Sequence, residues 1–274
     1  MSVKKYRDEQ GRIIFGTTFI KAFRDDSACP KKLLEYFLLG NFSSPQTEAM
    51  LKGNYFEYLC LGATADDQQI PELPRLKAKD KDSGEFKKST DHLRIDAQAK
   101  LFPDVLSNYK IIVTEVQKSL RHEMGEFVIA TKADIFGSIH DPENGFVEEA
   151  YVDLKLTKDI NNTFGDFQWH DPETRDHTQA FLTVATHYKM TGRIAKFYYL
   201  VFDYKEDSEH ILVEKRVTAN DIFEFFETVR TIIEKIAELN EQQWPTNPSW
   251  NNCENCLLKS GCQAIPPRKP IRRV

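Results

Sequence analysis

Residues 151–157 read YVDLKLT, and this short stretch decides how the rest of the chain is interpreted. Side chains alternate across a β-strand, so the Val and the two Leu residues share one face. Asp153 and Lys155 share the other face. The apolar face predicts burial against a helix. An exposed strand shows the same alternation, so the acid and the amine alone do not indicate a functional site. Other residues of the chain have to support that interpretation.

Two further carboxylates occupy apolar surroundings upstream. Asp134 lies in ATKADIFGSI (residues 130–139), where an uncompensated charge is costly unless it is paired, protonated or bound to a cation. Glu57 follows a phenylalanine in a predicted helix and faces the same cost. If the strands that carry Asp134 and Asp153 are neighbours, their carboxylates converge on one divalent ion. Such hard oxygen donors suit magnesium or manganese.

The cysteines form a second pattern. Cys29 lies near the start of the chain, and Cys253, Cys256 and Cys262 follow one another as CxxCx5C in a polar segment where burial does not explain three thiols. Thiolates suit zinc or an iron-sulfur cluster, and spacing alone does not choose between the two. A shared site would join the two ends of the chain. The fifth cysteine, Cys60, lies in the apolar segment YFEYLCLG and is predicted to be a buried, unreactive thiol.

Composition limits the classes of protein to consider. The 274 residues are 41% hydrophobic, which is enough for a sizeable core. The chain has no apolar run of about 18 residues and no apolar leader, which predicts a cytoplasmic protein without a membrane partner. An odd number of cysteines in such a chain argues against disulfides. The net charge of -5 gives no general attraction to polyanions, although residues 75–88 and the tail at residues 266–274 are locally basic.

The periodicity of the chain predicts an α/β fold with a mixed sheet flanked by helices. A capping box of Thr218 and Asp221 is expected to start a long final helix that reaches about residue 239. The other predicted helices are residues 30–40, 44–62, 92–106 and 176–190. The predicted strands are residues 109–120, 123–137, 146–157, 194–204 and 210–216.

Taken in this order, the residues resemble the PD-(D/E)XK nuclease superfamily, and specifically its RecB-like exonuclease branch. Asp134 followed by the pair Asp153 and Lys155 matches the split motif of that superfamily. The segment GNYFE, which ends in Glu57, looks like the helical Gly-x-x-x-(Glu/His) motif that precedes it. Position 153 is Asp where many members carry Glu, and position 57 is Glu where several iron-sulfur members have His.

The helix TQAFLTVATHY (residues 178–188) looks like the Gln and Tyr motif of the same branch. Gln179 takes the first place and Tyr188 the second, although the family's Tyr usually follows its Gln by one helical turn, where this chain has Thr183. Tyr188 also lies on the apolar stripe of its helix, so core packing explains it equally well. The resemblance implies that Gln179 positions the nucleophile or the scissile phosphate.

The flanking cysteines are similar to those of the iron-sulfur subset, which includes the AddB nuclease domain and the nucleases of CRISPR adaptation. One cysteine precedes the nuclease core in that subset and three follow it as CxxCx5C. The resemblance implies a 4Fe-4S cluster at Cys29, Cys253, Cys256 and Cys262, with zinc as the alternative. It also implies a restriction-endonuclease-like core (αβββαβ) at about residues 44–240 of one nuclease domain, residues 1–274, with the termini joined by the cysteine metal site.

The implied activity is that of a DNA exonuclease that hydrolyses single-stranded ends with Mg2+ or Mn2+, alone or beside a helicase or recombination protein. Glu57, Asp134 and Asp153 would hold the metal. The implied catalytic residues are Glu57, Asp134, Asp153, Lys155, Gln179 and Tyr188. Two alternatives stay open. One is a non-catalytic DNA-binding or helicase-partner module of the same fold, and the other is a structure-specific endonuclease.

Overall fold

The computed structural model describes residues 6–25, 27–41, 46–62, 77–79, 86–140, 145, 147–161, 169, 176–205, 209–238, 246–247, 253, 256, 258 and 262. The chain divides into two units. The first unit comprises Met1–Ser44, Arg121–Ala130 and Phe223–Val274, and the second comprises Pro45–Leu120 and Thr131–Ile222. The single nuclease domain expected over residues 1–274 stays a prediction. Within the described part of the chain, no helix combines the length and apolarity that crossing a membrane requires.

The second unit is built on a mixed sheet. β5 (Phe127–His140) pairs antiparallel with β6 (Val147–Thr157). β6 runs parallel to β7 (Lys196–Asp203), and β7 runs antiparallel to β8 (His210–Glu214). The parallel pair needs a crossover, and α5 (Thr178–Thr191) lies within it. The mixed α/β sheet flanked by helices that the sequence predicts is thereby confirmed.

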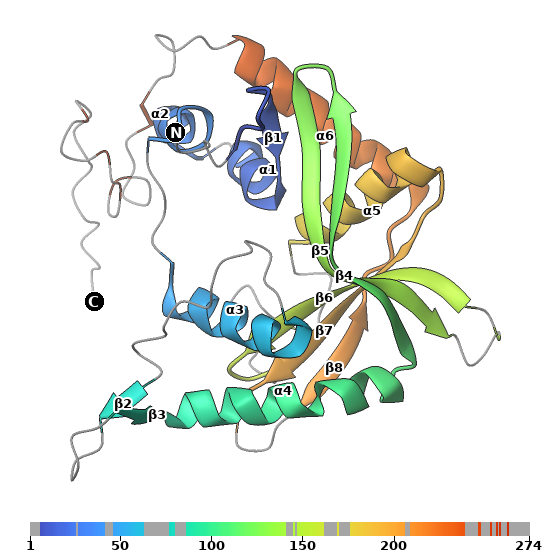
Figure 1. Ribbon diagram of the computed structural model, residues 1–274. Helices are drawn as coiled ribbons and strands as arrows, with labels where there is room; N and C mark the ends of the chain where they lie inside the picture. The colour runs from blue at the N-terminus through green and yellow to red at the C-terminus, as the bar shows by residue number, and fades with distance from the viewer. Residues whose placement is uncertain are drawn as a thin grey trace, which may run out of the picture. The chain divides into compact units, whose positions relative to one another are not determined.

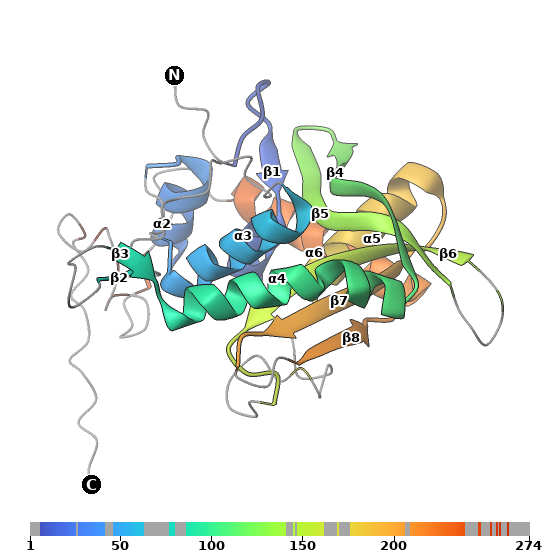
Figure 2. The same ribbon diagram turned by 60° about the horizontal axis from the view of Figure 1, so that its bottom comes forward.

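Helices cover both faces of this sheet. α3 (Glu48–Leu61) and α4 (Thr90–Asn108) lie side by side on one face, and α5 lies on the other (Figures 1 and 2). Val152 and Leu154 of β6 are buried on the α3 and α4 side, as the alternation of YVDLKLT predicts. The buried residues of this core are Tyr55, Phe56, Ile95, Phe102, Val105, Ile111, Ile135, Val152, Leu154, Leu200 and Phe202.

Local capping signals account for the helix ends. Thr47 accepts a hydrogen bond from a backbone N–H of the first turn of α3, and Gly62 ends that helix with φ 70°. The predicted start at residue 44 falls outside the described residues. Ser89 caps α4 in the same way. The capping box is confirmed, because Thr218 N donates to Asp221 Oδ2 (2.7 Å) and Asp221 N donates to Thr218 Oγ1 (3.2 Å) ahead of α6 (Ala219–Glu238).

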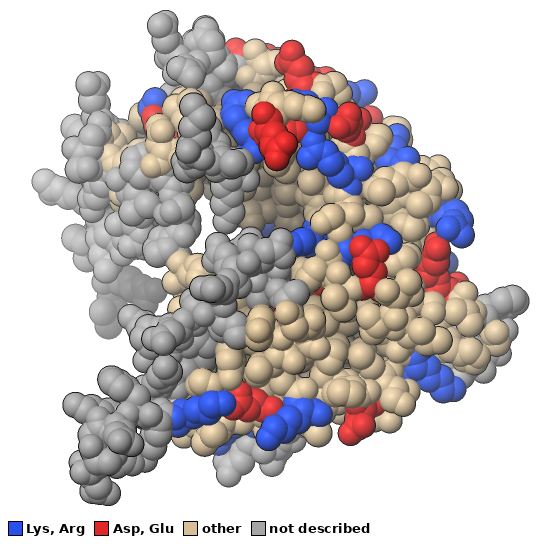
Figure 3. All heavy atoms as spheres, in the orientation of Figure 1, with Lys and Arg blue, Asp and Glu red and all other residues tan. Residues whose placement is uncertain are grey.

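A short ribbon that the sequence analysis does not predict precedes α4. β2 (Lys77–Lys79) pairs antiparallel with β3 (Phe86–Lys88) inside the basic stretch. Described basic and acidic side chains follow one another along α4 on the face shown in Figure 3. The visible charge of α4 is therefore mixed in sign, in keeping with the small net charge of the chain.

The first unit contains elements that the sequence analysis missed. β1 (Ile13–Phe15) pairs parallel with the start of β5, and α1 (Thr17–Arg24) follows β1 directly. α2 (Pro30–Leu33) begins at Pro30 as predicted and continues as the π-helix η1 (Leu34–Leu38). A set of aromatic rings packs these segments together. Its members are Tyr6, Phe15, Phe19, Phe23, Phe37 and Phe127.

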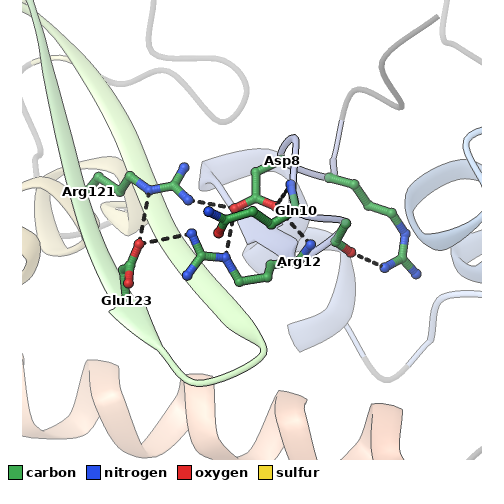
Figure 4. Close-up of polar contacts among 7 residues, drawn as sticks. Asp8, Gln10, Arg12, Arg121 and Glu123 are labelled. Atoms are coloured by element: carbon green, nitrogen blue, oxygen red, sulfur yellow. Dashed lines mark hydrogen bonds and ion pairs between the residues drawn. The ribbon is translucent and has the colours of Figure 1, made fainter. Parts of the chain in front are cut away.

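β4 (Ile111–Met124) extends past residue 120, where the predicted strand ends, and pairs with β5. Its charged residues find partners near the N-terminus (Figure 4). Asp8 accepts hydrogen bonds from Arg121 Nη2 (2.6 Å) and Arg12 Nε (2.8 Å), and Arg12 Nη2 lies 2.9 Å from Glu123 Oε1. Desolvation raises the pKa of Asp8, but the hydrogen bonds from Arg121 and Arg12 outweigh it and lower that pKa to about 2.

Candidate active site

The strand β6 places Asp153 and Lys155 on the face that α5 covers. Asp153 is only 2% exposed, whereas Lys155 is partly exposed. Lys155 Nζ forms an ion pair with Asp153 Oδ2. A buried carboxylate needs such a partner, because transfer of an unpaired charge out of water is costly. The pair that the sequence places on one face of a strand therefore lies in contact within the fold.

Asp134 of β5 lies next to this pair. The antiparallel register joins Ile135 to Val152, so the next step along the strands carries Asp134 to the position opposite Asp153. Asp134 Oδ2 accepts a hydrogen bond from Leu154 N (2.7 Å). The metal prediction requires the two acids to lie on neighbouring strands and on the same face of the sheet. The register of β5 and β6 meets this condition.

The environment of Asp134 disfavours its charged form. Burial raises the pKa of Asp134 well above 3.8, and the charges of Asp153 and Glu57 raise it further. Lys155 and the hydrogen bond from Leu154 act in the opposite direction but are weaker. A divalent cation would relieve this repulsion directly, so the charge balance of the site fits a bound cation.

Gln179 completes the group from the other side. It is the second residue of α5, and its Nε2 donates a hydrogen bond to Asp153 Oδ1. Its Oε1 accepts a hydrogen bond from Lys155 Nζ at 3.3 Å. Asp153, Lys155 and Gln179 therefore fix one another in a closed ring of contacts. Gln179 therefore contacts two of the predicted catalytic residues, and its role in positioning the nucleophile or the phosphate stays a prediction.

Glu57 approaches from α3 through a residue that the sequence analysis missed. Gln117 Nε2 of β4 donates to Glu57 Oε1 (2.7 Å) and lies 3.4 Å from Asp134 Oδ1. In the sequence, Gln117 is one polar residue in an alternating strand, and nothing distinguishes it from a solvent-facing position. Its backbone has φ 51°, a conformation that the sequence does not reveal.

Tyr188 is not among these contacts. It lies in the last turn of α5 with 38% of its surface exposed. It lies nine positions after Gln179, and a helix rises about 13.5 Å over nine residue steps. Thr183 lies one helical turn after Gln179, at the position where the Gln and Tyr motif usually has its Tyr, and it is buried at 1% exposure. The structure therefore brings five of the six predicted catalytic residues together and leaves Tyr188 outside their contacts.

The donor set of Glu57, Asp134 and Asp153 fits Mg2+ or Mn2+, because all three supply hard carboxylate oxygens. No three His, Cys, Asp or Glu side chains among the described residues are arranged as a ready-made metal site. Gln117 links Glu57 to Asp134 instead, while Gln179 and Lys155 hold Asp153. A cavity of about 400 Å3 elsewhere in the second unit has none of these carboxylates in its lining.

The predicted cysteine site belongs to the first unit. Cys29 immediately precedes α2, and its Sγ accepts a hydrogen bond from Asn247 N (3.4 Å), so the C-terminal segment lies against it. Asn247 Nδ2 also donates to the carbonyl oxygen of Ser27 (3.1 Å). Cys256 N donates to Cys253 O (3.4 Å). The contacts of Asn247 bring it against Ser27 and Cys29, while the four cysteines, all among the described residues and none in a disulfide, are not arranged as a metal site.

Cys60 is half-buried, whereas the sequence predicts a buried thiol. It packs against the core between α3 and α4, and burial raises the pKa of its thiol, with a further contribution from the charge of Glu57. A thiol with a raised pKa is protonated at neutral pH and is a poor nucleophile and metal ligand.

Comparison with known proteins adds information on the fold alone. No protein-family model matches the chain, and no curated protein matches it in sequence. The chain is similar to a solved structure from Eubacterium rectale that is provisionally described as an exonuclease, with a TM-score of 0.57 and 16% identity over 99% of this chain and 96% of that chain. A second structure, SSO0001, matches with a TM-score of 0.36 and 12% identity over 94% of this chain and 87% of that chain, which is too weak to support an argument.

Proposed function

We propose that this protein is a divalent-metal-dependent DNA nuclease that acts as an exonuclease on single-stranded ends. The observation that carries the proposal is the position of Asp134 opposite Asp153, with Lys155 paired to Asp153 and Glu57 close enough to raise the pKa of Asp134. A protein that only binds DNA has no chemical need for three acids and an amine gathered in one place.

The proposed chemistry is hydrolysis of a phosphodiester. When bound, Mg2+ or Mn2+ would lower the pKa of the water that it holds and would neutralise charge on the phosphate. Glu57, Asp134 and Asp153 would hold the ion. Lys155 carries a proton at Nζ beside Asp153 and can stabilise the charge that develops on the phosphate or orient the attacking water. Gln179 holds the Lys155 ammonium in that direction through its Oε1.

The similarity of fold supports the same class of activity. The Eubacterium rectale protein shares the fold over nearly the whole of both chains, and its provisional description is that of an exonuclease. A fold alone does not determine an activity. The proposal therefore rests on the carboxylate and lysine geometry, and the fold similarity agrees with it.

The test is cleavage of end-labelled linear DNA and of circular DNA, each single-stranded and duplex, with Mn2+, Mg2+ or a chelator. We expect metal-dependent loss of linear single strands from their ends, with circles left intact. Lys155→Ala should lower the cleavage rate by roughly 10²- to 10⁴-fold. Lys158→Ala is the matched control, because Lys158 is an exposed lysine just beyond the end of β6. Equal rates for Lys155→Ala and the parent would contradict the assignment.

The two other functions are outcomes of the same experiment. Cutting of circular DNA would favour a structure-specific endonuclease. Tight DNA binding without any metal-dependent cleavage would favour a binding or helicase-partner module. If the reaction requires DNA unwinding, a helicase or recombination protein would supply it, since this sequence contains no GxxxxGK[ST] loop.

We also propose that Cys29, Cys253, Cys256 and Cys262 hold a 4Fe-4S cluster, with zinc as the alternative. The hydrogen bonds of Asn247 to Cys29 and Ser27 support a site that joins the two ends of the chain. Four thiolates suit either metal. Anaerobic purification with iron, sulfide and zinc analysis tests the proposal, and a colourless preparation that carries zinc would replace the cluster by a zinc site.

A further inference from the structure

Gln117 has an unusual backbone for its place in the chain. It lies in the middle of β4, yet its φ is 51°, in the left-handed region that residues with a side chain rarely adopt. Among the described residues, the other non-glycine residue with positive φ is Lys110, at the junction of α4 and β4. The hairpin turn between β4 and β5 does not require this conformation, because that turn is formed by Gly125, eight residues later.

The strained conformation directs the Gln117 amide between two acids. Its Nε2 donates to Glu57 Oε1 at 2.7 Å and lies 3.4 Å from Asp134 Oδ1. Its Oε1 is buried without a hydrogen-bond partner in the described part of the chain. The hydrogen bonds from Nε2 to the two carboxylates therefore determine the orientation of the Gln117 amide.

Glu57 and Asp134 repel each other, since the charge of Glu57 raises the pKa of Asp134. They also come from different elements, α3 and β5, that no shared backbone hydrogen bond holds in register. A neutral amide that donates to both reduces the repulsion and fixes their relative position without adding charge. Backbone strain at functional sites persists when the surrounding structure gains something specific from it.

We propose that Gln117 is a positioning residue that holds Glu57 and Asp134 in the arrangement needed to bind the divalent cation. This inference rests on the proposed nuclease function, because it assigns Gln117 to the same metal site. Gln117 acts through the two carboxylates. Replacing a residue that orients metal ligands without binding the metal itself typically lowers metal affinity by about 10- to 100-fold.

The backbone offers a variant that separates this role from a merely structural one. Glycine adopts φ 51° without strain, so in Gln117→Gly the relief of backbone strain offsets the lost amide hydrogen bonds, and the metal-free variant should stay folded. Lys110→Gly is the matched control, because it relieves the same kind of strain at φ 53° without any contact to the carboxylates. Gln117→Asn is a second variant, since Asn tolerates positive φ but its amide is one methylene too short to bridge both acids.

The experiment is calorimetric titration of Mn2+ into the parent and the three variants, with thermal midpoints measured in chelator. We expect Gln117→Gly and Gln117→Asn to lose about 10- to 100-fold in Mn2+ affinity and Lys110→Gly to match the parent. Parent-like affinity in a folded Gln117→Gly or Gln117→Asn protein would overturn the inference. If the parent itself binds no Mn2+ and Asp134→Asn changes nothing, the proposed function fails first and the inference falls with it.

Discussion

Replacing Asp134 by Asn should stabilise the metal-free protein at high pH while destroying its metal site. The contacts of Gln117, 2.7 Å to Glu57 Oε1 and 3.4 Å to Asp134 Oδ1, keep these two carboxylate oxygens within about 6 Å of each other. With an effective dielectric constant of about 20, two unit charges about 6 Å apart repel by about 2.8 kcal/mol. The Asn variant keeps an oxygen that can accept the Leu154 N–H but carries no charge.

The pH dependence gives the sign of the effect. A carboxyl whose pKa is raised by folding stabilises the folded protein fully below its unfolded pKa of about 4, and this contribution is lost as pH rises through the folded pKa. Burial, Asp153 and Glu57 raise the pKa of Asp134, so the parent should lose free energy of unfolding as the pH rises. The free energy of unfolding of Asp134→Asn should equal that of the parent near pH 4. At pH 9 it should exceed that of the parent by up to about 2.8 kcal/mol.

The assay is urea unfolding in chelator, followed by tryptophan fluorescence at pH 4, 7 and 9. A constant difference between variant and parent over this range would refute the placement of Asp134 in a buried cluster of acids. Mn2+ provides a second check, since it should raise the midpoint of the parent and leave that of Asp134→Asn unchanged. A parent-like Mn2+ response from the variant would equally contradict the reasoning.

Three further predictions follow from single contacts. Asp8→Asn should lower the unfolding temperature at pH 7, and the difference should vanish as the pH falls from about 4 through the pKa of about 2, because the stabilising contribution of a depressed carboxyl is lost on protonation. Gly137→Ala should destabilise the fold by at least about 3 kcal/mol in urea unfolding, since the new Cβ would lie 1.9 Å from the carbonyl oxygen of Ile112. Tyr188→Ala should keep DNA cleavage within about twofold of the parent, as expected for a residue that is 38% exposed and outside the carboxylate contacts; a large loss in that assay would return Tyr188 to the site.

Local patterns predicted the parts of the fold that local physics controls. The alternation of residues 151–157, the capping box of Thr218 and Asp221 and the helix that ends at Gly62 depend on neighbouring residues alone. The order of helices and strands in the second unit followed from the same periodicities. These signals were sufficient to place Asp134 and Asp153 on adjacent strands.

The missed features depend on residues far apart in the chain. β1 is three residues long and exists because it pairs with the start of β5, more than a hundred residues later. β4 extends past residue 120, where the predicted strand ends, and Arg121 and Glu123 in this extension pair with Asp8 and Arg12. A single sequence does not show such pairings.

The site was predicted unevenly for a related reason. Asp153, Lys155 and Gln179 were predicted from sequence motifs, and the structure brings these three residues into contact. Gln117 has no motif, and its role depends on a backbone angle that its side chain does not favour. Tyr188 matched a motif only loosely, and its distance along α5 from Gln179 keeps it apart from the acids.

The raised pKa of the Cys60 thiol makes it possible to count the other cysteines by chemical labelling. Alkylating reagents consume the thiolate form, and Cys60 is held protonated, so it should remain unlabelled at neutral pH. Intact-mass analysis of the alkylated chain would then give four adducts for an empty cysteine site and none for a filled one. The fraction of molecules that carry their metal could be measured in a mixed preparation without any spectroscopic signal from the metal itself.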